Sequence, residues 1–117
     1  MNREELKKRT KEFALRIIKL VNSLPNNPAG RVIGNQLLRA GTSVGANYRA
    51  ACRSKSKSDF IYKISIVEEE ADESAFWLEI IIESGLMPKS KIESLLKEAD
   101  ELTAIFVSTN KTAKSNK

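Results

Sequence analysis

Three short interruptions divide an otherwise helix-forming chain of 117 residues into four segments. Two prolines, two asparagines and a glycine interrupt the helical pattern at LPNNPAG (24–30), and serines and lysines weaken it at SKSKS (54–58). The third break, SGLMPKS (84–90), combines a glycine suited to a helix C-terminus with a proline that opens the next segment. No stretch alternates with the period of two that strands require. We therefore predict an all-α fold with helices over residues 3–23, 29–54, 58–84 and 89–110.

Each predicted helix carries an apolar stripe that needs a partner. The stripe of the first helix consists of Leu6, Phe13, Ile17, Leu20 and Leu24, and that of the last helix of Ile92, Leu95, Leu96, Ala99, Leu102 and Phe106. Because short connections place consecutive helices antiparallel, residues 1–110 are predicted to form one domain, an up-down-up-down four-helix bundle. Ser90 and Glu93 match a capping box at the start of the last helix. The lysine-containing tail, residues 111–117, is predicted to be disordered.

Three glycines, Gly34, Gly41 and Gly45, fall on one stripe of the second helix, although glycine costs about 1 kcal/mol relative to alanine inside a helix. Glycines aligned in this way allow a neighbouring helix to approach closely, and the added dispersion contacts offset the cost. We expect such a close approach here. A ligand gap beside the helix is the alternative interpretation.

The third helix is apolar on two faces. Its inward stripe is predicted to be Phe60, Ile64, Val67, Ala71, Ala75, Leu78 and Ile82, and the second stripe is Tyr62, Ile66, Phe76, Trp77 and Ile80. A four-helix domain has too little chain to cover both faces, and exposed apolar patches usually mark an interface. The second stripe therefore predicts a homo-oligomer in which this helix lies at the contact. Alternatively, the second stripe packs beneath helix bends or the ends of the last helix.

Charge is distributed unevenly along the chain. Residues 1–57 contain 13 Lys/Arg and 3 Asp/Glu, whereas residues 58–110 contain 4 and 12. Such asymmetry predicts pairing within the molecule, an acidic partner, or both. Arginine presents a planar fork that matches phosphate, so the basic surface predicts RNA or DNA binding through the phosphate backbone. The residues proposed for this surface are Arg31, Arg39, Arg49, Arg53, Lys55 and Lys57.

Catalytic and metal-binding patterns are weak. The sequence has no histidine, and its single cysteine, Cys52, lies near an apolar stripe and is interpreted as a small core residue. Glu69 and Glu73 are one turn apart, as are Glu68 and Asp72, so a metal site is conceivable. Solvated carboxylates, or carboxylates paired with the first two helices, are the preferred interpretation. We predict a protein that is not an enzyme and has no catalytic residue, metal or cofactor.

Neither a signal peptide nor a membrane span is expected. The charged start MNREELKKRT lacks an apolar core, and no apolar run approaches the roughly 20 residues that a span requires. One cysteine allows no internal disulfide, which suits a reducing compartment. We therefore expect a cytoplasmic protein without a membrane partner.

Several short elements resemble a known bacterial family. They are SVGANYRAA (43–51), Asp59-Phe60, Glu70-Ala71, Trp77-Leu78-Glu79 and the loop with Leu24-Pro25. Their order and spacing resemble the four-helix-bundle proteins encoded in intervening sequences of 23S rRNA genes, a family related to the accessory variability protein of diversity-generating retroelements. The resemblance implies a bundle that assembles into a ring, typically a pentamer. It also implies contact with RNA in the retroelement protein, and it offers no catalytic residues.

The sequence thus predicts a homo-oligomeric four-helix bundle that binds RNA or another structured nucleic acid through its arginine-rich surface. The alternative is an oligomeric scaffold or adaptor that docks another protein. In that case the arginines would form pairs between subunits with the acidic third helix.

Overall fold

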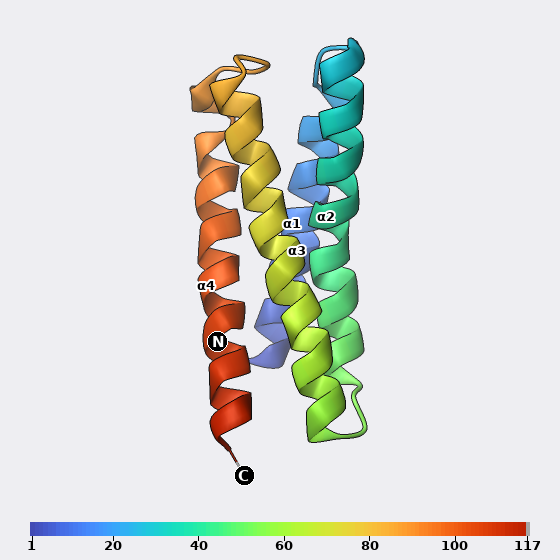
Figure 1. Cartoon of the computed structure of the whole chain (residues 1–117), viewed down its shortest axis with the longest axis vertical. Helices are drawn as coiled ribbons and strands as arrows, with labels where there is room; N and C mark the ends of the chain where they lie inside the picture. The colour runs from blue at the N-terminus through green and yellow to red at the C-terminus, as the bar shows by residue number, and fades with distance from the viewer. Residues whose placement is uncertain (117) are drawn as a thin grey trace.

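Four long α-helices make up the fold in the computed structural model, which describes residues 1–116. They are α1 (Arg3–Asn22), α2 (Pro28–Cys52), α3 (Lys57–Glu83) and α4 (Glu93–Ser115), with a short 3₁₀ turn, η1 (Lys89–Lys91), before α4. The described residues contain no strand. The helices lie side by side in an elongated molecule of 49 × 20 × 19 Å, and successive connections lie at alternate ends (Figure 1). The arrangement is that of a four-helix bundle.

Side chains just before each of the first three helices explain where those helices begin. The side chains of Asn2, Asn27 and Ser56 accept hydrogen bonds from backbone N–H groups three residues later. Each cap satisfies one of the amide donors that a helix start leaves without an intrahelical partner. Asn27 is followed by Pro28 at the first helical position, where the missing N–H of proline does no harm.

The start of α4 differs from the capping box expected at Ser90 and Glu93. Residues 89–91 form η1, and α4 follows from Ile92 without a side-chain cap. The expected cap is therefore wrong, because Ser90 lies inside the 3₁₀ turn rather than before the α-helix. At the end of α3, Gly85 has φ 75°, and the amides of Gly85 and Leu86 donate to the carbonyls of Ile82 and Ile81. This pattern is a Schellman motif, as a glycine at this position predicts.

The last helix also extends beyond its predicted end. α4 continues through residues 111–115, where a disordered tail was expected. Two features account for the extension: residues 111–115 contain neither proline nor glycine, and Asn110 is buried against α3. The Nδ2–H group of Asn110 donates to the Ser65 hydroxyl at 3.0 Å. Lys117, the last residue of the expected tail, lies outside the described residues.

The core is a continuous column of apolar side chains that all four helices contribute. The stripes predicted for α1 and α4 are buried or packed against this core. On α3 the prediction differs from the structure at both ends: Phe60 is half-buried at the start, and at the end Ile81 is fully buried whereas Ile82 is half-buried. Ser74, which no apolar pattern could place, is also buried, with its hydroxyl donating to the Glu70 carbonyl at 2.8 Å.

The glycine stripe of α2 packs closely against a neighbouring helix, as predicted, and the structure identifies this helix as α1. A methyl group added at Gly41 would lie 2.7 Å from Cγ1 of Ile17, and one at Gly45 would lie 3.3 Å from the backbone of Thr10. The first distance is shorter than real carbon contacts allow, so α1 could not keep its position beside a larger residue. Glycine therefore sets the spacing of α1 and α2.

The contact between α1 and α4 is much less extensive than the other contacts between neighbouring helices. One hollow of about 370 Å³ lies between the C-terminal half of α1 and the start of α4, and another of about 570 Å³ lies at the opposite end of this seam. Between them, the guanidinium of Arg9 binds both carboxylate oxygens of Glu98 at 2.7 Å and also contacts Glu101 at 3.1 Å. The hydrogen bonds from Arg9 to Glu98 raise the pKa of Arg9, so it remains charged.

Candidate nucleic-acid interface

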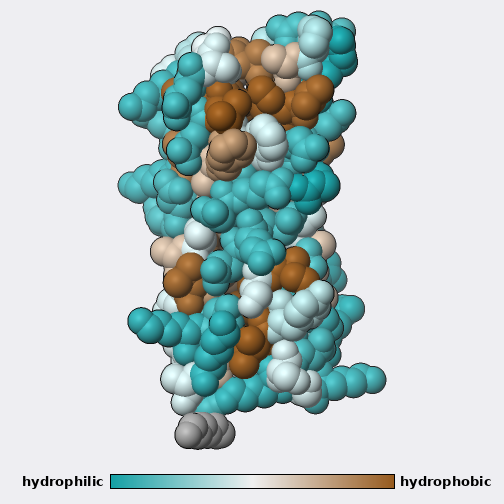
Figure 2. Space-filling view, in the orientation of Figure 1, coloured by the Kyte–Doolittle hydropathy of each residue, from teal (hydrophilic) through white to brown (hydrophobic). Residues whose placement is uncertain are grey.

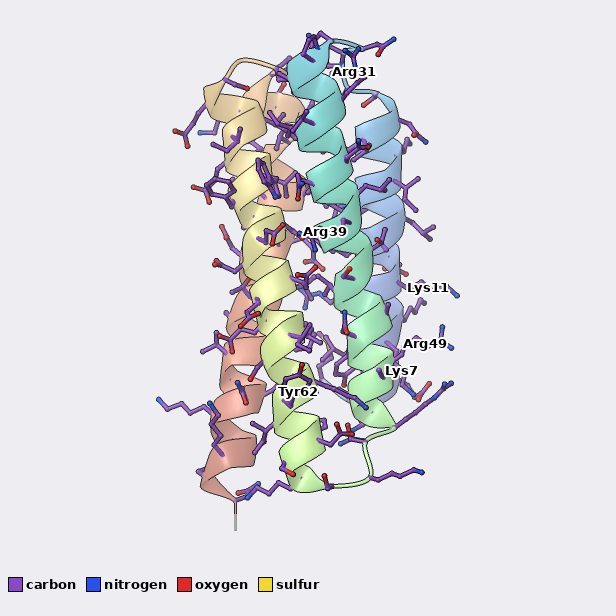
Figure 3. The ribbon with its side chains drawn as sticks, turned by 45° about the vertical axis from the view of Figure 1, so that its right-hand side comes forward. Lys7, Lys11, Arg31, Arg39, Arg49 and Tyr62 are labelled. Carbon is purple, nitrogen blue, oxygen red and sulfur yellow. The ribbon has the colours of Figure 1, made fainter. Side chains whose placement is uncertain are left out.

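Basic side chains gather where α1 and α2 meet near the start of α1. A hollow of about 400 Å³ is lined by Lys7, Lys8 and Lys11 of α1 and by Arg49 and Arg53 of α2. In Figure 3, Lys7, Lys11 and Arg49 lie along this border. We call these five residues and the hollow that they line the basic groove. Lys7 and Lys11 are one helical turn apart and therefore lie on the same side of α1, and both line this hollow together with Arg49 of α2.

The cations of the basic groove are mostly without acidic partners. Glu4 is the one carboxylate in its lining, and it pairs with Lys7 at 3.1 Å. Within residues 1–116, no carboxylate lies within 4.0 Å of the charged groups of Lys8, Lys11, Arg49 or Arg53. All four are exposed. The groove therefore has an excess of positive charge that is available to an anionic partner.

Small side chains form the continuation of the basic groove toward the middle of the molecule. A second hollow of about 200 Å³ shares Lys7, Lys11 and Arg49 with the first, and its remaining lining is Ala14, Thr42, Gly45 and Ala46. Gly45, which lies against Thr10 of α1, has no side chain and therefore leaves this part of the surface open. Neither lining contains an aromatic residue. Such a surface can contact phosphates but offers no ring for base stacking.

Arg39 lies apart from the groove and is neutralised within the chain. Its guanidinium binds Glu70 of α3 at 3.1 Å and also forms a short ion pair with Glu73. The hydrogen bond to Glu73 raises the pKa of Arg39. The side chain is half exposed, so this arginine is paired with α3 but still reaches the solvent.

The remaining predicted basic residues do not form one ridge with Arg49 and Arg53. Arg31 lies at the end of the molecule where α2 begins and donates to the Asn26 side chain at 3.1 Å (Figure 3). Lys55 and Lys57 are exposed in and after the connection from α2 to α3. This connection lies at the opposite end of α2 from Arg31 and follows Arg53 directly. The structure therefore brings together Arg49 and Arg53, places Lys55 and Lys57 at the same end, and separates Arg31 and Arg39.

The residues of the second apolar stripe on α3 differ in exposure. Tyr62 and Phe76 are 66% and 50% exposed, whereas Ile66, Trp77 and Ile80 are half-buried. Trp77 packs against the core and donates from Nε1 to Glu73 at 3.2 Å. On the face shown in Figure 2, apolar side chains gather in two areas separated by a hydrophilic belt. On α3 itself, the exposed members of the second stripe are Tyr62 and Phe76.

The acidic run at residues 68–73 is partly explained by these pairs. Glu70 and Glu73 bind Arg39, which matches the expectation that they pair with a preceding helix. Among the residues that the structure describes, no group of three or more His, Cys, Asp or Glu side chains is arranged to hold a metal ion. Cys52 is half-buried with a free thiol. No helix within residues 1–116 is long and apolar enough to cross a membrane.

Sequence reasoning missed the contribution of α1 to the basic groove. Lys7, Lys8 and Lys11 entered only as part of the charge excess of residues 1–57. The helical wheel holds a usable signal, because Lys7 and Lys11 lie beside the buried stripe on the flank of α1 that also carries Ala14. Which neighbouring helix this flank meets is a tertiary property, and it depends on the glycines of α2.

Comparison with known proteins agrees with the fold. A family model described as "23S rRNA-intervening sequence protein" matches residues 3–108. The chain is also similar to the crystal structure of a protein of unknown function from the S23 ribosomal protein family of Bacteroides thetaiotaomicron VPI-5482. The two share 36% sequence identity over 95% of this chain and 99% of that chain, with a TM-score of 0.87. No curated protein matches the chain.

Proposed function

The chain belongs to the 23S rRNA-intervening sequence protein family, and from this premise we propose that it is a homo-oligomeric, non-enzymatic protein that binds RNA or another structured nucleic acid. Binding would take place in the cytoplasm, through phosphate contacts with the basic groove. The four helices would follow the up-down-up-down order, which the alternating connections in Figure 1 support. The proposal assigns no catalytic residue, metal or cofactor.

The observation that carries the proposal is the excess of unpaired cations in the basic groove. Five basic side chains from two helices surround a hollow that includes one carboxylate, Glu4. Elsewhere, Arg9 and Arg39 are neutralised by α4 and α3. Without an anionic partner, carboxylates of the same chain would stabilise the basic groove, as they do at Arg9 and Arg39. The positive charge of the groove and the absence of aromatic residues from its lining favour sequence-tolerant binding that weakens as salt rises.

Self-association is supported by the exposed aromatic residues of α3. Burial of a large apolar side chain contributes about 1.5–3 kcal/mol relative to exposure. Tyr62 and Phe76 are both at least half exposed, so association of copies through α3 would be favourable. The family resemblance adds the expectation of a ring, typically a pentamer.

The same aromatic residues favour a second candidate function, a scaffold that docks another protein without touching nucleic acid. The sequence-based prediction of such a scaffold places the arginines in pairs between subunits with α3. The bonds of Arg39 to Glu70 and Glu73 occur within one chain, so this arginine is already occupied. The scaffold would then depend on the apolar face of α3 rather than on arginine.

Charge reversal in the groove tests the proposal. We would measure the affinity of wild type, Arg49→Glu/Arg53→Glu and Lys8→Glu/Lys11→Glu for a structured RNA hairpin by fluorescence anisotropy at several salt concentrations. Each double variant should bind more than about tenfold more weakly, and the slope of log K against log salt should decrease by about one for each lost phosphate contact. A duplex DNA of equal length would show which nucleic acid is preferred.

The matched control is Lys97→Glu/Lys111→Glu, which makes the same change in net charge on exposed positions of α4. It should bind within about twofold of wild type, because long-range charge effects are screened over about 10 Å at 0.1 M salt. Equal binding by wild type and both groove variants would refute the interface. Light scattering on the same samples should show an unchanged assembly mass, so that weaker binding by a groove variant reports lost phosphate contacts and not a lost assembly.

A further inference from the structure

The C-terminal half of α3 presents an aromatic ring among carboxylates. Asp72, Phe76, Glu79 and Glu83 follow one another at intervals of four, three and four residues, so they lie on one stripe of the helix. All four are exposed, and the ring of Phe76 is held edge-on against Trp77 with 4.9 Å between ring centroids. Within residues 1–116, no basic group lies within 4.0 Å of the three carboxylates. We call these four residues the acidic stripe.

The seam between α1 and α4 has the complementary character. The hollow of about 370 Å³ at its upper end in Figure 1 has a floor of Leu20, Met87 and Leu95 and a rim of three cations, Arg16, Lys19 and Lys91. We call it the seam hollow. Its lining contains no carboxylate, and Arg16 is held in place by a hydrogen bond to the Ser94 hydroxyl at 2.9 Å. An apolar cavity of about 150 Å³ accommodates benzene, so this hollow has room for a phenyl ring.

The two surfaces lie at the same height of the molecule but are formed by different helices. Residues 72–83 of α3, the end of α1 and the start of α4 all lie in the upper part of Figure 1. The acidic stripe is on the exposed face of α3, whereas the seam hollow is between α1 and α4. One copy therefore cannot fill its own hollow with its own stripe. Two acidic stripes facing each other would repel, which disfavours a symmetric contact between α3 helices.

We propose that the acidic stripe of one copy docks into the seam hollow of a second copy, with Phe76 on the apolar floor and the carboxylates against Arg16, Lys19 and Lys91. This inference rests on the proposed self-association and names the two surfaces that carry it. Because the surfaces differ, each copy would use one as donor and the other as acceptor. Such a head-to-tail contact builds closed rings or open filaments rather than a two-fold dimer.

A charge swap tests this pairing in the full-length protein. One variant reverses the acidic stripe (Asp72→Lys/Glu79→Lys), and the other reverses the rim of the seam hollow (Arg16→Glu/Lys91→Glu). Each variant alone should lose association, and its mass by analytical ultracentrifugation should fall to that of one chain, 13.1 kDa. An equimolar mixture should associate again, because the reversed stripe of the first variant now complements the reversed rim of the second.

The mixture separates loss of docking from loss of folding, since misfolded chains would not be restored by mixing. Phe76→Ser should also weaken association, whereas Lys97→Glu/Lys111→Glu, which changes the net charge as much as the rim variant does but on exposed residues outside both surfaces, should leave the mass unchanged. If the reversed variants keep the wild-type assembly mass, or if mixing restores nothing, the pairing is wrong although self-association stands. A wild type that stays monomeric would overturn self-association itself, while RNA binding through the basic groove would remain separately measurable.

Discussion

Along α2, helix α1 packs so closely that Gly41 leaves no room for a methyl group against Ile17, whereas along α4 the same helix leaves two hollows with an ion pair between them. The first seam depends on backbone proximity and van der Waals contact. The second depends on Arg9, Glu98 and Glu101. One helix thus joins a tight contact, whose outer rim carries the basic groove, to a loose contact that leaves space for a ligand or a second copy. Different substitutions should weaken the two seams.

The tight seam should lose stability when one of its glycines is enlarged. Gly41→Ala would place a methyl group 2.7 Å from Cγ1 and 3.1 Å from Cβ of Ile17, which the rigid branched side chain cannot avoid. Overpacking costs about 1–3 kcal/mol, and the gain in helix propensity returns at most about 1 kcal/mol. We expect a net decrease of about 1–2 kcal/mol in the free energy of unfolding, measured by urea denaturation.

Gly34→Ala is the matched control on the same glycine stripe. Its methyl group would meet Cδ1 of Leu24 at 3.3 Å, and this is the tip of a half-buried side chain that can move. The propensity gain should then offset the contact, leaving stability within about 0.5 kcal/mol of wild type. Equal losses in the two variants would show that Gly41 has no special part in setting the seam.

The loose seam should respond to removal of its ion pair. Arg9→Met leaves the carboxylate of Glu98, which is only 17% exposed, without its guanidinium partner. We expect a loss of about 1–2 kcal/mol, because an unpaired, partly buried charge is more costly than an exposed one. The double variant Arg9→Met/Glu98→Leu should recover most of this loss, since both charges are then gone. A double variant as unstable as the single one would mean that packing of Arg9, not pairing, supports the seam.

A pH-dependent effect is expected at the lower end of the loose seam. Tyr48 lines the larger hollow, and burial, followed by the influence of the neighbouring Cys52 thiol, raises the pKa of its phenol above the ordinary value of 10. A raised pKa means that the folded state holds the proton more tightly than the unfolded state. The stabilisation is therefore complete below pH 10 and decreases above it, by up to about 1.4 kcal/mol per pH unit.

Tyr48→Phe tests this dependence, because phenylalanine has no proton to lose. Its free energy of unfolding should decline less between pH 9 and 11 than that of wild type. Tyr62→Phe, which removes a phenol from an exposed position of α3, should follow the wild-type profile. Identical profiles for all three proteins would contradict a role for Tyr48.

The smallest effect concerns the basic groove at the outer rim of the tight seam. Glu4→Gln removes the carboxylate from the groove and frees Lys7 from a pair in which the Glu4 side chain is 84% exposed. Affinity for the RNA hairpin should rise about twofold to threefold at low salt, while stability stays within error, because exposed pairs contribute little. Unchanged affinity would indicate that Lys7 does not contact the nucleic acid. Glu12→Gln, an exposed change on the same helix outside the groove lining, is the control.

The fold was largely predictable because local chemistry determines it. Prolines and glycines mark the ends of the helices, and the apolar stripes of α1 and α4 coincide with the core. The errors lie where periodicity is not decisive. Ser74 can be buried because its hydroxyl donates to the Glu70 carbonyl of its own helix. Asn110 anchors the extension of α4 through a hydrogen bond to Ser65, which is distant in the sequence.

The candidate site was predictable only in part, because charge on one helix does not reveal what faces it. Arg39 and Arg49 look alike in the sequence, yet Arg39 meets the carboxylates of α3 and Arg49 meets the lysines of α1. Helix pairing decides between neutralisation and accumulation of charge. The seam hollow could not be predicted from the sequence either, because it results from the limited contact between α1 and α4.

In the turn after α3, the backbone of residue 85 must adopt a left-handed conformation, but the size of its side chain is not restricted. Gly85 has φ 75°, yet a side-chain carbon added there would meet no atom within 4 Å. An L-alanine would strain the turn although space is available, whereas a chain prepared by chemical ligation with D-alanine at this position would satisfy both the mirror-image backbone region and the open surroundings. The corner between α3 and α4 is therefore a place where stereochemistry alone could be varied, with the rest of the molecule unchanged.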